Sequence, residues 1–187
     1  MIASKDRSGW FGASDTDRIM QSWNTKTFEN WYMEKIGIRK NGFFNEATLA
    51  GTYFEHSIID KVVPLATKDR QILIPELHLR VNLDADYENT IYEIKTYRAD
   101  KGFKVPLKYF RQVNVEMFAF NTKSAYIVSY GLVEDDYKNF FNPIIKDRIT
   151  LHEIEYDESF ICSYLKRLEY LSECLGKGVF PNESKIA

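Results

Sequence analysis

Two neighbouring segments of alternating polarity constrain the fold of this chain most strongly. Over residues 77–84 apolar side chains alternate with polar ones, the apolar set being Leu77, Leu79, Val81 and Leu83. This period of two is typical of a strand with one face on a core, so we expect Asp84 on the polar face near its end. Residues 86–90 are rich in turn formers, and residues 91–97 read as a second strand. The sequence therefore predicts a β-hairpin.

The hairpin would bring two carboxylates and one amine together. Strand alternation places Glu93 and Lys95 on one face and Ile94 on the other, and Asp84 approaches them across the turn. Carboxylate oxygens suit Mg²⁺ or Mn²⁺, and a second ion about 4 Å away would stabilise both oxygens of an in-line displacement at phosphorus. Lys95 would orient the attacking water or neutralise developing charge. The alternative is a surface hairpin whose charges are solvated.

Composition limits the classes of protein that fit. With 187 residues and 44% hydrophobic content, we expect one domain, residues 1–187, around one substantial core. A net charge of −2 argues against coating nucleic acid by bulk charge, so any DNA contact must be local. The segment 95–111 fits that demand, although a solvated face is the alternative; its cations are Lys95, Arg98, Lys101, Lys104, Lys108 and Arg111.

The lengths of the apolar runs and the spacing of the two cysteines bear on where the protein works and on whether it forms a disulfide. No apolar run approaches the roughly 18–20 residues of a membrane helix, so we expect no membrane contact and a cytoplasmic protein, in the host cytoplasm if phage-encoded. Cys162 and Cys174 lie twelve positions apart in one predicted helix. That spacing is about 18 Å, too far for a disulfide, and predicts packing residues in a reducing compartment.

Helices and strands alternate along the chain. Helices are expected at about 14–20 with Ser14 as its N-cap, 28–36, 45–63, 106–121 and 158–175. Strands are expected at about 71–84, 90–97, 125–133 and 149–156. This order predicts an α/β (α+β) architecture, with helices flanking a mixed central β-sheet.

The order and spacing of several short motifs resemble the lambda-phage exonuclease and YqaJ-type viral recombinase family, a branch of the PD-(D/E)XK nucleases. The motifs are Arg7 before Ser14, Gly51 with Glu55, Asp84 with Glu93 and Lys95, Gln112, and the strand AYIVSYG. Two positions depart from the family pattern, Leu83 in place of Pro and Ala85 in place of Gly. The second leaves open the turn shape and whether Asp86 shares the metal role.

The resemblance implies a restriction-endonuclease-like core and a catalytic centre. Asp84, Glu93 and the backbone carbonyl of Ile94 would bind Mg²⁺, with Mn²⁺ able to substitute and two ions expected. Glu55 would act through a coordinated water, and Lys95 would position the nucleophile. Glu55 falls off the apolar stripe of its helix, and an exposed surface residue is the alternative.

Other positions are expected to support the centre or to contact DNA. Gly51, one helical turn from Glu55, lets the sheet or substrate approach. The resemblance has Gln112 contacting the site, Arg7 and Ser14 receiving a 5′-phosphate, and either Arg98 or Lys101 meeting DNA phosphate. For Ser14 and Arg7 the alternative is a simple helix N-cap and an exposed arginine. Trp10 and Phe11 are weaker candidates for contact with the DNA end.

The function that this resemblance implies is a Mg²⁺-dependent 5′-to-3′ exodeoxyribonuclease acting on linear duplex ends in phage-type homologous recombination. It also implies a ring of three subunits and a single-strand annealing protein as partner. Three alternatives stay open: a structure-specific or restriction-type endonuclease of the same superfamily, a catalytically silent DNA-binding recombination accessory protein, and an unrelated globular protein with a fortuitous motif.

Overall fold

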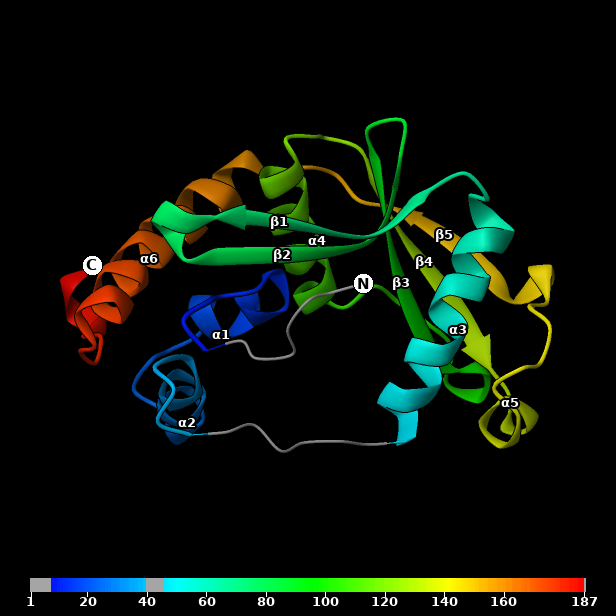
Figure 1. Ribbon diagram of the computed structural model, residues 1–187, viewed down its shortest axis with the longest axis horizontal. Coiled ribbons are helices and arrows are strands. Elements are labelled where there is room, and N and C mark those ends of the chain that lie inside the picture. Colours follow the sequence, from blue (N-terminus) through cyan, green and yellow to red (C-terminus); the bar gives the residue numbers. More distant parts are fainter. Residues whose placement is uncertain (1–7, 40–45, 187) are drawn as a thin grey trace.

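The fold is organised around one five-stranded sheet. The computed structural model describes residues 8–39 and 46–186 (Figure 1). The strands are β1 Thr67–Ile74, β2 Leu79–Tyr87, β3 Thr90–Arg98, β4 Ala125–Leu132 and β5 Ile149–Glu153. They lie in sequence order, antiparallel except for the parallel pair β3 and β4. The sheet is therefore mixed, as predicted.

Helices cover both faces of this sheet (Figure 1). They are α1 Thr16–Met20, α2 Lys26–Lys35, α3 Glu46–Val62, α4 Leu107–Phe120, α5 Glu134–Lys138 and α6 Glu158–Lys177. The larger core joins residues of β2 and β4 to α1, α2, α4 and α6. A smaller core on the other face packs α3 against β3 and β4. The predicted α/β class, with helices flanking a mixed sheet, is confirmed.

The hairpin between β2 and β3 forms with a two-residue turn. Glu88 and Asn89 both adopt positive φ, 47° and 61°, between the paired residues Tyr87 and Thr90. A positive φ at both central positions matches the twist of flanking strands and suits a short polar residue such as Asn. The predicted hairpin is thus correct, although β2 continues through Asp86, which the sequence had placed in the turn.

The prediction of one strand over residues 71–84 is wrong. The chain instead makes a 3₁₀ turn at Pro75–Leu77, and Ile74 pairs with Leu79 across an antiparallel ladder. Pro75 has no backbone N–H to donate, so it cannot continue a central strand. The result is an added strand, β1, whose side chains reach the same pocket as those of β2.

Two further differences concern the ends of helices. Ser14 is not an N-cap: it lies inside a 3₁₀ turn, Ala13–Asp15, that precedes α1. The short helix α5 was not predicted; the Asp136 carboxylate stabilises its start by accepting the Val133 N–H at 2.9 Å. Asn45, the expected start of the third helix, lies outside the described residues.

No helix in the described part of the chain combines the length and apolarity that a bilayer crossing requires. Both cysteines are free thiols, Cys162 exposed and Cys174 buried. The prediction that they do not pair with each other is confirmed.

Candidate active site

The central sheet opens between β2 and β3, and this opening places the site. The two strands pair only from Ala85 with Tyr92 to Tyr87 with Thr90, whereas β3 pairs with β4 along its whole length. Beyond Ala85, β2 and β3 therefore diverge. Asp84 and Glu93 flank the point of divergence, which we call the fork.

Asp84 is fixed at the fork by the backbone of β3. Its Oδ2 accepts the Ile94 N–H at 2.8 Å. An extended residue directs its N–H and C=O to the same edge of the strand, so the Ile94 carbonyl also faces the fork. The two metal-ligating groups expected at Asp84 and Ile94 thus lie on the same side of β3.

Glu93 is buried and held by two neighbours. Its Oε1 accepts hydrogen bonds from Lys95 Nζ and from Gln112 Nε2 of α4, both at 2.6 Å. Gln112 also donates to Glu116 Oε1 at 2.8 Å. Gln112 thus contacts Glu93, and Glu116 is a buried acid beside it that the sequence analysis missed.

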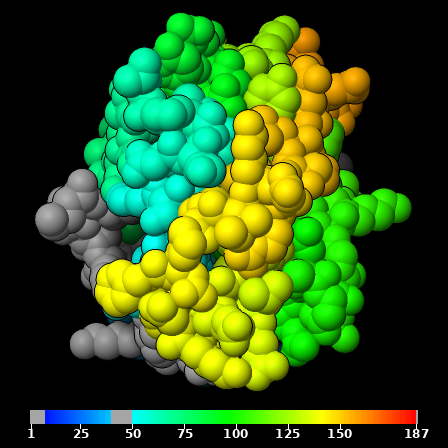
Figure 2. Space-filling model, turned by 90° about the vertical axis from the view of Figure 1, so that its right-hand side faces the viewer, coloured from blue at the N-terminus to red at the C-terminus, as the bar shows by residue number. Residues whose placement is uncertain are grey.

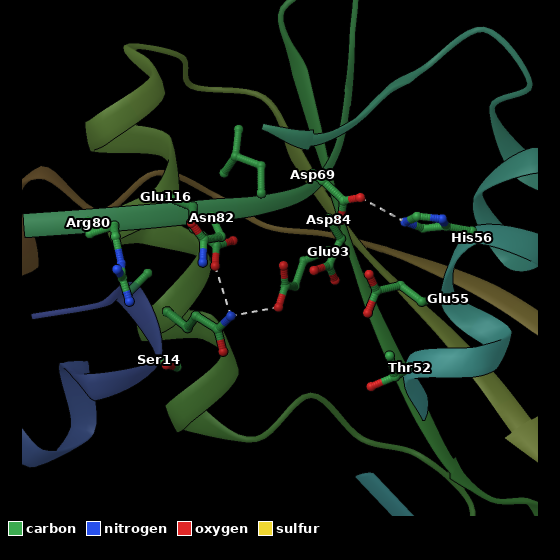
Figure 3. A pocket seen from close by; sticks show the side chains of 13 residues that line it. Ser14, Thr52, Glu55, His56, Asp69, Arg80, Asn82, Asp84, Glu93 and Glu116 are labelled. Carbon is green, nitrogen blue, oxygen red and sulfur yellow. Dashed lines mark hydrogen bonds and ion pairs between the residues drawn. The ribbon is translucent and has the colours of Figure 1, made fainter. Parts of the chain in front are cut away.

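A cavity of about 500 Å³ opens on this cluster (Figure 3). Its walls come from the 3₁₀ turn Ala13–Asp15 and from α3, β1, β2, β3 and α4. The residues that line it are Ala13, Ser14, Thr52, Glu55, His56, Asp69, Arg80, Asn82, Leu83, Asp84, Glu93, Gln112 and Glu116. We refer to it as the acidic pocket.

Glu55 turns into the acidic pocket from α3 (Figure 3), so the exposed-surface alternative is wrong. Burial, followed by repulsion from Glu93, raises the pKa of Glu55 to about 7. Burial and repulsion from Glu93 and Glu55 likewise raise the pKa of Asp84 well above its ordinary value. Burial and Glu93 do the same for Glu116. Such clustered negative charge favours a bound cation.

Gly51 lets α3 approach the sheet closely. A Cβ built on Gly51 would lie 3.2 Å from Thr96 Oγ1 on β3. Glu55, one turn further along α3, is thereby carried to the edge of β3. The close packing expected at Gly51 is confirmed.

Lys95 approaches Glu93 from beside the acidic pocket and is not one of the residues lining it. Its ammonium also lies 4.7 Å from the centre of the Tyr109 ring. Burial would lower the pKa of Lys95, but the charges of Glu93 and Asp84 outweigh it and raise the pKa above its ordinary value. Lys95 is therefore a permanent positive charge and no proton acceptor at neutral pH.

The 3₁₀ turn that carries Ser14 is anchored by a buried ion pair. Asp15 accepts the N–H groups of Gly12 and Trp31 at 2.8 and 2.9 Å, and it pairs with the ammonium of Lys35 from α2. Lys35 also donates to the Trp10 carbonyl at 3.0 Å. Ser14 itself is exposed and lines the acidic pocket.

The loop before this turn is joined to β2. The Phe11 N–H donates to the His78 carbonyl at 2.7 Å, and the Phe11 carbonyl accepts the Arg80 N–H at 2.8 Å. These bonds seat the Phe11 side chain in the core with no exposed surface, so its candidacy for contact with a DNA end is wrong. Trp10 stays half-buried beside His78.

Four expected site residues remain, namely Arg7, Arg98, Lys101 and Asp86. Arg7 lies outside the described residues. Arg98 is exposed at the end of β3 and pairs with Asp100 at 3.0 Å, and Lys101 is exposed in the next turn. Asp86 is buried, and both its oxygens accept hydrogen bonds from Arg70 at 2.6 and 3.0 Å. That ion pair gives Asp86 a structural partner in place of a metal.

Sequence analysis missed His56 of α3 and Asp69 of β1 as residues that line the pocket. His56 and Asp69 form an ion pair at 3.2 Å, and with Glu55 they make a trio whose ligand atoms all lie within 4.8 Å of one another. Arg80 and Asn82 were assigned only to the polar face of a strand. Asn82 lies two residues before Asp84 and Arg80 lies four residues before it. This spacing was the signal that would have placed both side chains on the same face of the strand as Asp84.

Comparison with known proteins identifies a set of structures with this fold. No protein-family model matches the chain, and no curated protein matches it significantly. An alkaline exonuclease from Laribacter hongkongensis superimposes with a TM-score of 0.71 at 19% identity, over 92% of this chain and 90% of that one. A structure of that enzyme in complex with dAMP gives the same TM-score at 20% identity, with the same coverage of both chains.

A second protein shows the same architecture. A phage-related exonuclease from Haemophilus somnus superimposes with a TM-score of 0.65 at 13% identity, covering 89% of this chain and 92% of that one. The likeness spans nearly all of each chain and confirms the restriction-endonuclease-like core expected from the sequence motifs. This chain therefore has the fold of the alkaline and phage-related exonucleases.

Proposed function

We infer that the protein is a Mg²⁺-dependent 5′-to-3′ exodeoxyribonuclease that acts on the ends of linear double-stranded DNA. The observation that carries this inference is the fork, where Asp84, Glu93 and Lys95 meet inside a fold shared with exonucleases. Hydrolysis from the 5′ end would release mononucleotides and leave a 3′ overhang. The dAMP in the Laribacter enzyme is a mononucleotide of that kind.

The residues at the fork fit a divalent cation. Glu93 is buried, and its Oε2 has no hydrogen-bond partner within the described chain. An unpaired buried carboxylate oxygen is costly unless a cation meets it. Asp84, Glu93 and the Ile94 carbonyl would hold Mg²⁺ or Mn²⁺, with Glu55 acting through water and a second ion close by. When bound, the metal would polarise the phosphoryl oxygen and lower the pKa of the attacking water.

The protein's own side chains would position and balance these charges. Lys95 forms an ion pair with Glu93 and would set a fixed positive charge beside the place where negative charge develops on phosphorus. Gln112 fixes the rotamer of Glu93 through one amide group that also contacts Glu116. Glu93 thus keeps Oε2 directed away from its two donors.

The DNA end would be recognised beside the acidic pocket. Ser14 offers a hydroxyl on a turn that the Asp15 and Lys35 ion pair holds in place. Arg7 would add a guanidinium fork to the same 5′-phosphate. Arg98 or Lys101, exposed beyond the carboxyl end of β3, would contact phosphates of the duplex.

The wider role follows from the resemblance of the sequence motifs. We propose that the protein works in phage-type homologous recombination, in the cytoplasm of the host cell, beside a single-strand annealing protein. A ring of three subunits would enclose the DNA. The annealing partner and the ring of three subunits are proposed from that resemblance alone.

The direct test is digestion of three DNA substrates with Mg²⁺. We expect rapid degradation of linear duplex carrying a 5′-phosphate, slower degradation without it, and no cutting of supercoiled circles. Ser14→Ala and Arg7→Ala should each reduce the preference for the phosphate. Cleavage of the closed circle would support an endonuclease of the same superfamily. Binding without any Mg²⁺-dependent product would support a silent accessory protein.

A further inference from the structure

The outer wall of the acidic pocket contains a cluster of three possible ligands, of which the proposed cleavage centre uses only Glu55. Glu55 and His56 are successive residues of α3, and Asp69 faces them from β1 (Figure 3). Their ligand atoms all lie within 4.8 Å of one another, and His56 Nε2 is 3.2 Å from Asp69 Oδ2. Ligands about 2.0–2.2 Å from a shared ion are themselves about 3–4.4 Å apart. The cluster therefore needs only small side-chain adjustments to hold one ion.

The backbone places Asp69 beside the cleavage centre. Lys68 pairs with Ala85 and Arg70 with Leu83, so Asp69 stands opposite Asp84, where the ladder pairing of β1 and β2 is interrupted. At that position Asp69 adopts a φ of 56°, in the left-handed region that non-glycine residues rarely occupy. The chain therefore departs from regular strand geometry at the residue whose carboxylate reaches His56.

The chemistry of the cluster differs from that of the fork. The fork offers carboxylate and carbonyl oxygens, whereas the outer cluster adds an imidazole nitrogen. An imidazole with two carboxylates favours ions such as Zn²⁺ or Co²⁺ over Mg²⁺, which prefers oxygen ligands and retains its waters. His56 is 51% exposed and Asp69 26% exposed, so an ion can reach the cluster from solvent.

The surroundings also favour a cation. Glu93, whose Oε2 lacks a hydrogen-bond partner within the described residues, and Asp84 line the same pocket as Glu55. Five acidic side chains, those of Glu55, Asp69, Asp84, Glu93 and Glu116, thus lie around one cavity (Figure 3). A transition-metal ion at the outer wall would offset part of the negative charge of these carboxylates.

We propose that Glu55, His56 and Asp69 form a second metal site, selective for a transition-metal dication of the Zn²⁺ class and separate from the Mg²⁺ site at the fork. Because Glu55 belongs to both, an ion held by His56 and Asp69 draws the Glu55 carboxylate toward the outer wall. Zn²⁺ at this site therefore opposes the role of Glu55 at the fork and inhibits cleavage. This consequence rests on the proposed function, whereas ion binding itself does not.

The test measures binding without DNA, so it is independent of any nuclease activity. Zn²⁺ is titrated by calorimetry, with excess Mg²⁺ present, into the native protein and into the Asp84→Asn/Glu93→Gln variant. We expect both to bind one equivalent. Adding His56→Ala to either should weaken Zn²⁺ binding at least tenfold. With Co²⁺, paramagnetically shifted imidazole proton signals of one histidine should appear and should vanish in His56→Ala.

The matched control is Asp60→Asn. Asp60 of α3 pairs with Lys68 of β1 at 2.6 Å, so this variant breaks a neighbouring ion pair between the same two elements. It should leave Zn²⁺ affinity unchanged. Equal affinity of native and His56→Ala proteins, or no Zn²⁺ binding once Asp84 and Glu93 are replaced, would overturn the second site and leave His56 and Asp69 as a simple ion pair.

If the native protein degrades linear duplex, inhibition gives a further readout. At fixed Mg²⁺, the Zn²⁺ concentration that halves the rate should rise at least tenfold in His56→Ala, compared with the rate of the same variant without Zn²⁺. Failure of the proposed function would appear as no cleavage by native protein, with Zn²⁺ binding intact. Failure of the second site would appear as cleavage with unchanged Zn²⁺ sensitivity in His56→Ala.

Discussion

At the scale of single residues, the pair formed by Lys95 and Glu93 is the most informative contact. The ammonium of Lys95 is fixed by Glu93 at 2.6 Å and by the ring of Tyr109, and its raised pKa keeps it charged. A fixed charge beside developing negative charge is worth far more in a partly buried site than in water. We therefore treat Lys95 as an electrostatic group.

Replacement of Lys95 by methionine tests this assignment. Lys95→Met keeps most of the aliphatic stem but removes the charge, so we expect cleavage of linear duplex to fall about 10²–10³-fold. The rate is measured by release of labelled nucleotides, with circular dichroism to confirm folding. Lys138→Met, at an exposed ion pair on α5, is the control and should keep native activity. A Lys95→Met rate within about threefold of the native rate would contradict the assignment.

Sequence reasoning located the residues of the fork because strand alternation and turn chemistry act locally. Asp84, Glu93 and Lys95 lie on one hairpin, and the twelve positions from Asp84 to Lys95 are enough to predict its strands and turn. His56, Asp69 and Glu116 reach the acidic pocket through the packing of α3, β1 and α4. No local pattern reports such contacts, so these residues were missed.

At the scale of elements, the contact between α2 and the 3₁₀ turn Ala13–Asp15 is the one on which the proposed recognition of a DNA end depends. The side chains of Lys35 and Asp15 are only 5% and 13% exposed, and the pair holds the turn that carries Ser14. Sequence analysis took Ser14 as a helix cap because the residue type fits that position. In the structure Asp15 takes a capping role, because its carboxylate accepts the Gly12 N–H.

Breaking this contact should weaken both stability and end recognition. Lys35→Met leaves the Asp15 carboxylate buried without its cation, which we expect to cost about 3–5 kcal/mol in urea unfolding. The preference for a 5′-phosphate should fall at the same time. Lys26→Met, which removes the exposed pair with Glu29, is the control and should cost less than about 1 kcal/mol. A similarly small cost for Lys35→Met would show that the contact is not needed.

The contact between α5 and the 3₁₀ turn Lys146–Arg148, which precedes β5, predicts how the stability of the fold depends on pH. Burial would raise the pKa of Asp136, but the Val133 N–H and the Arg148 guanidinium, at 2.9 and 2.6 Å, lower it below its ordinary value. A carboxylate whose folded pKa is lowered stabilises the fold above its unfolded pKa of about 3.9. That contribution is lost as the pH falls from there through the lower folded pKa.

Acid unfolding of variants measures this contribution. The free energy of unfolding of native protein should fall between about pH 5 and pH 2 more steeply than that of Asp136→Asn. Asp147→Asn removes an exposed carboxylate nearby and should follow the native curve. Parallel curves for native and Asp136→Asn proteins would exclude Asp136 as the source of acid sensitivity.

Elements with a strong repeating pattern were predicted well, and those that depend on a single residue were not. The helices α4 and α6 were placed almost to the residue because their apolar stripes run for fourteen and twenty positions. The division of residues 71–84 into two strands depended on Pro75 and on left-handed backbone at His78. One strand-breaking residue inside an alternating run is easily overlooked, because the pattern on either side of it still predicts a strand.

At the scale of the whole molecule, the fold gathers negative charge that only a cation can offset. The acidic side chains of Glu55, Asp69, Asp84, Glu93 and Glu116 line one pocket. Burial, together with their mutual repulsion, raises the pKa of Glu55, Asp84 and Glu116. A ligand that binds only the folded state stabilises it by mass action. The protein without metal is therefore expected to be less stable than the metal-bound form.

Thermal unfolding with and without Mg²⁺ tests this expectation. We expect Mg²⁺ at about 100 times its dissociation constant to stabilise native protein by about 2.7 kcal/mol, seen as a rise in Tm that EDTA reverses. In Asp84→Asn/Glu93→Gln the rise should be absent, because the oxygens at the fork no longer carry charge. A Tm of native protein that is indifferent to Mg²⁺ would argue against an ion at the fork.

Cleavage of linear duplex by native protein and by the conservative variants Asp84→Asn and Glu93→Gln, each with Mg²⁺ and then EDTA, tests the central claim most directly. The account predicts nucleotide release by native protein in Mg²⁺, none in EDTA, and a loss of at least about 10²-fold in each folded variant. Undiminished, Mg²⁺-dependent cleavage by either variant would contradict the assignment of the fork as the catalytic centre.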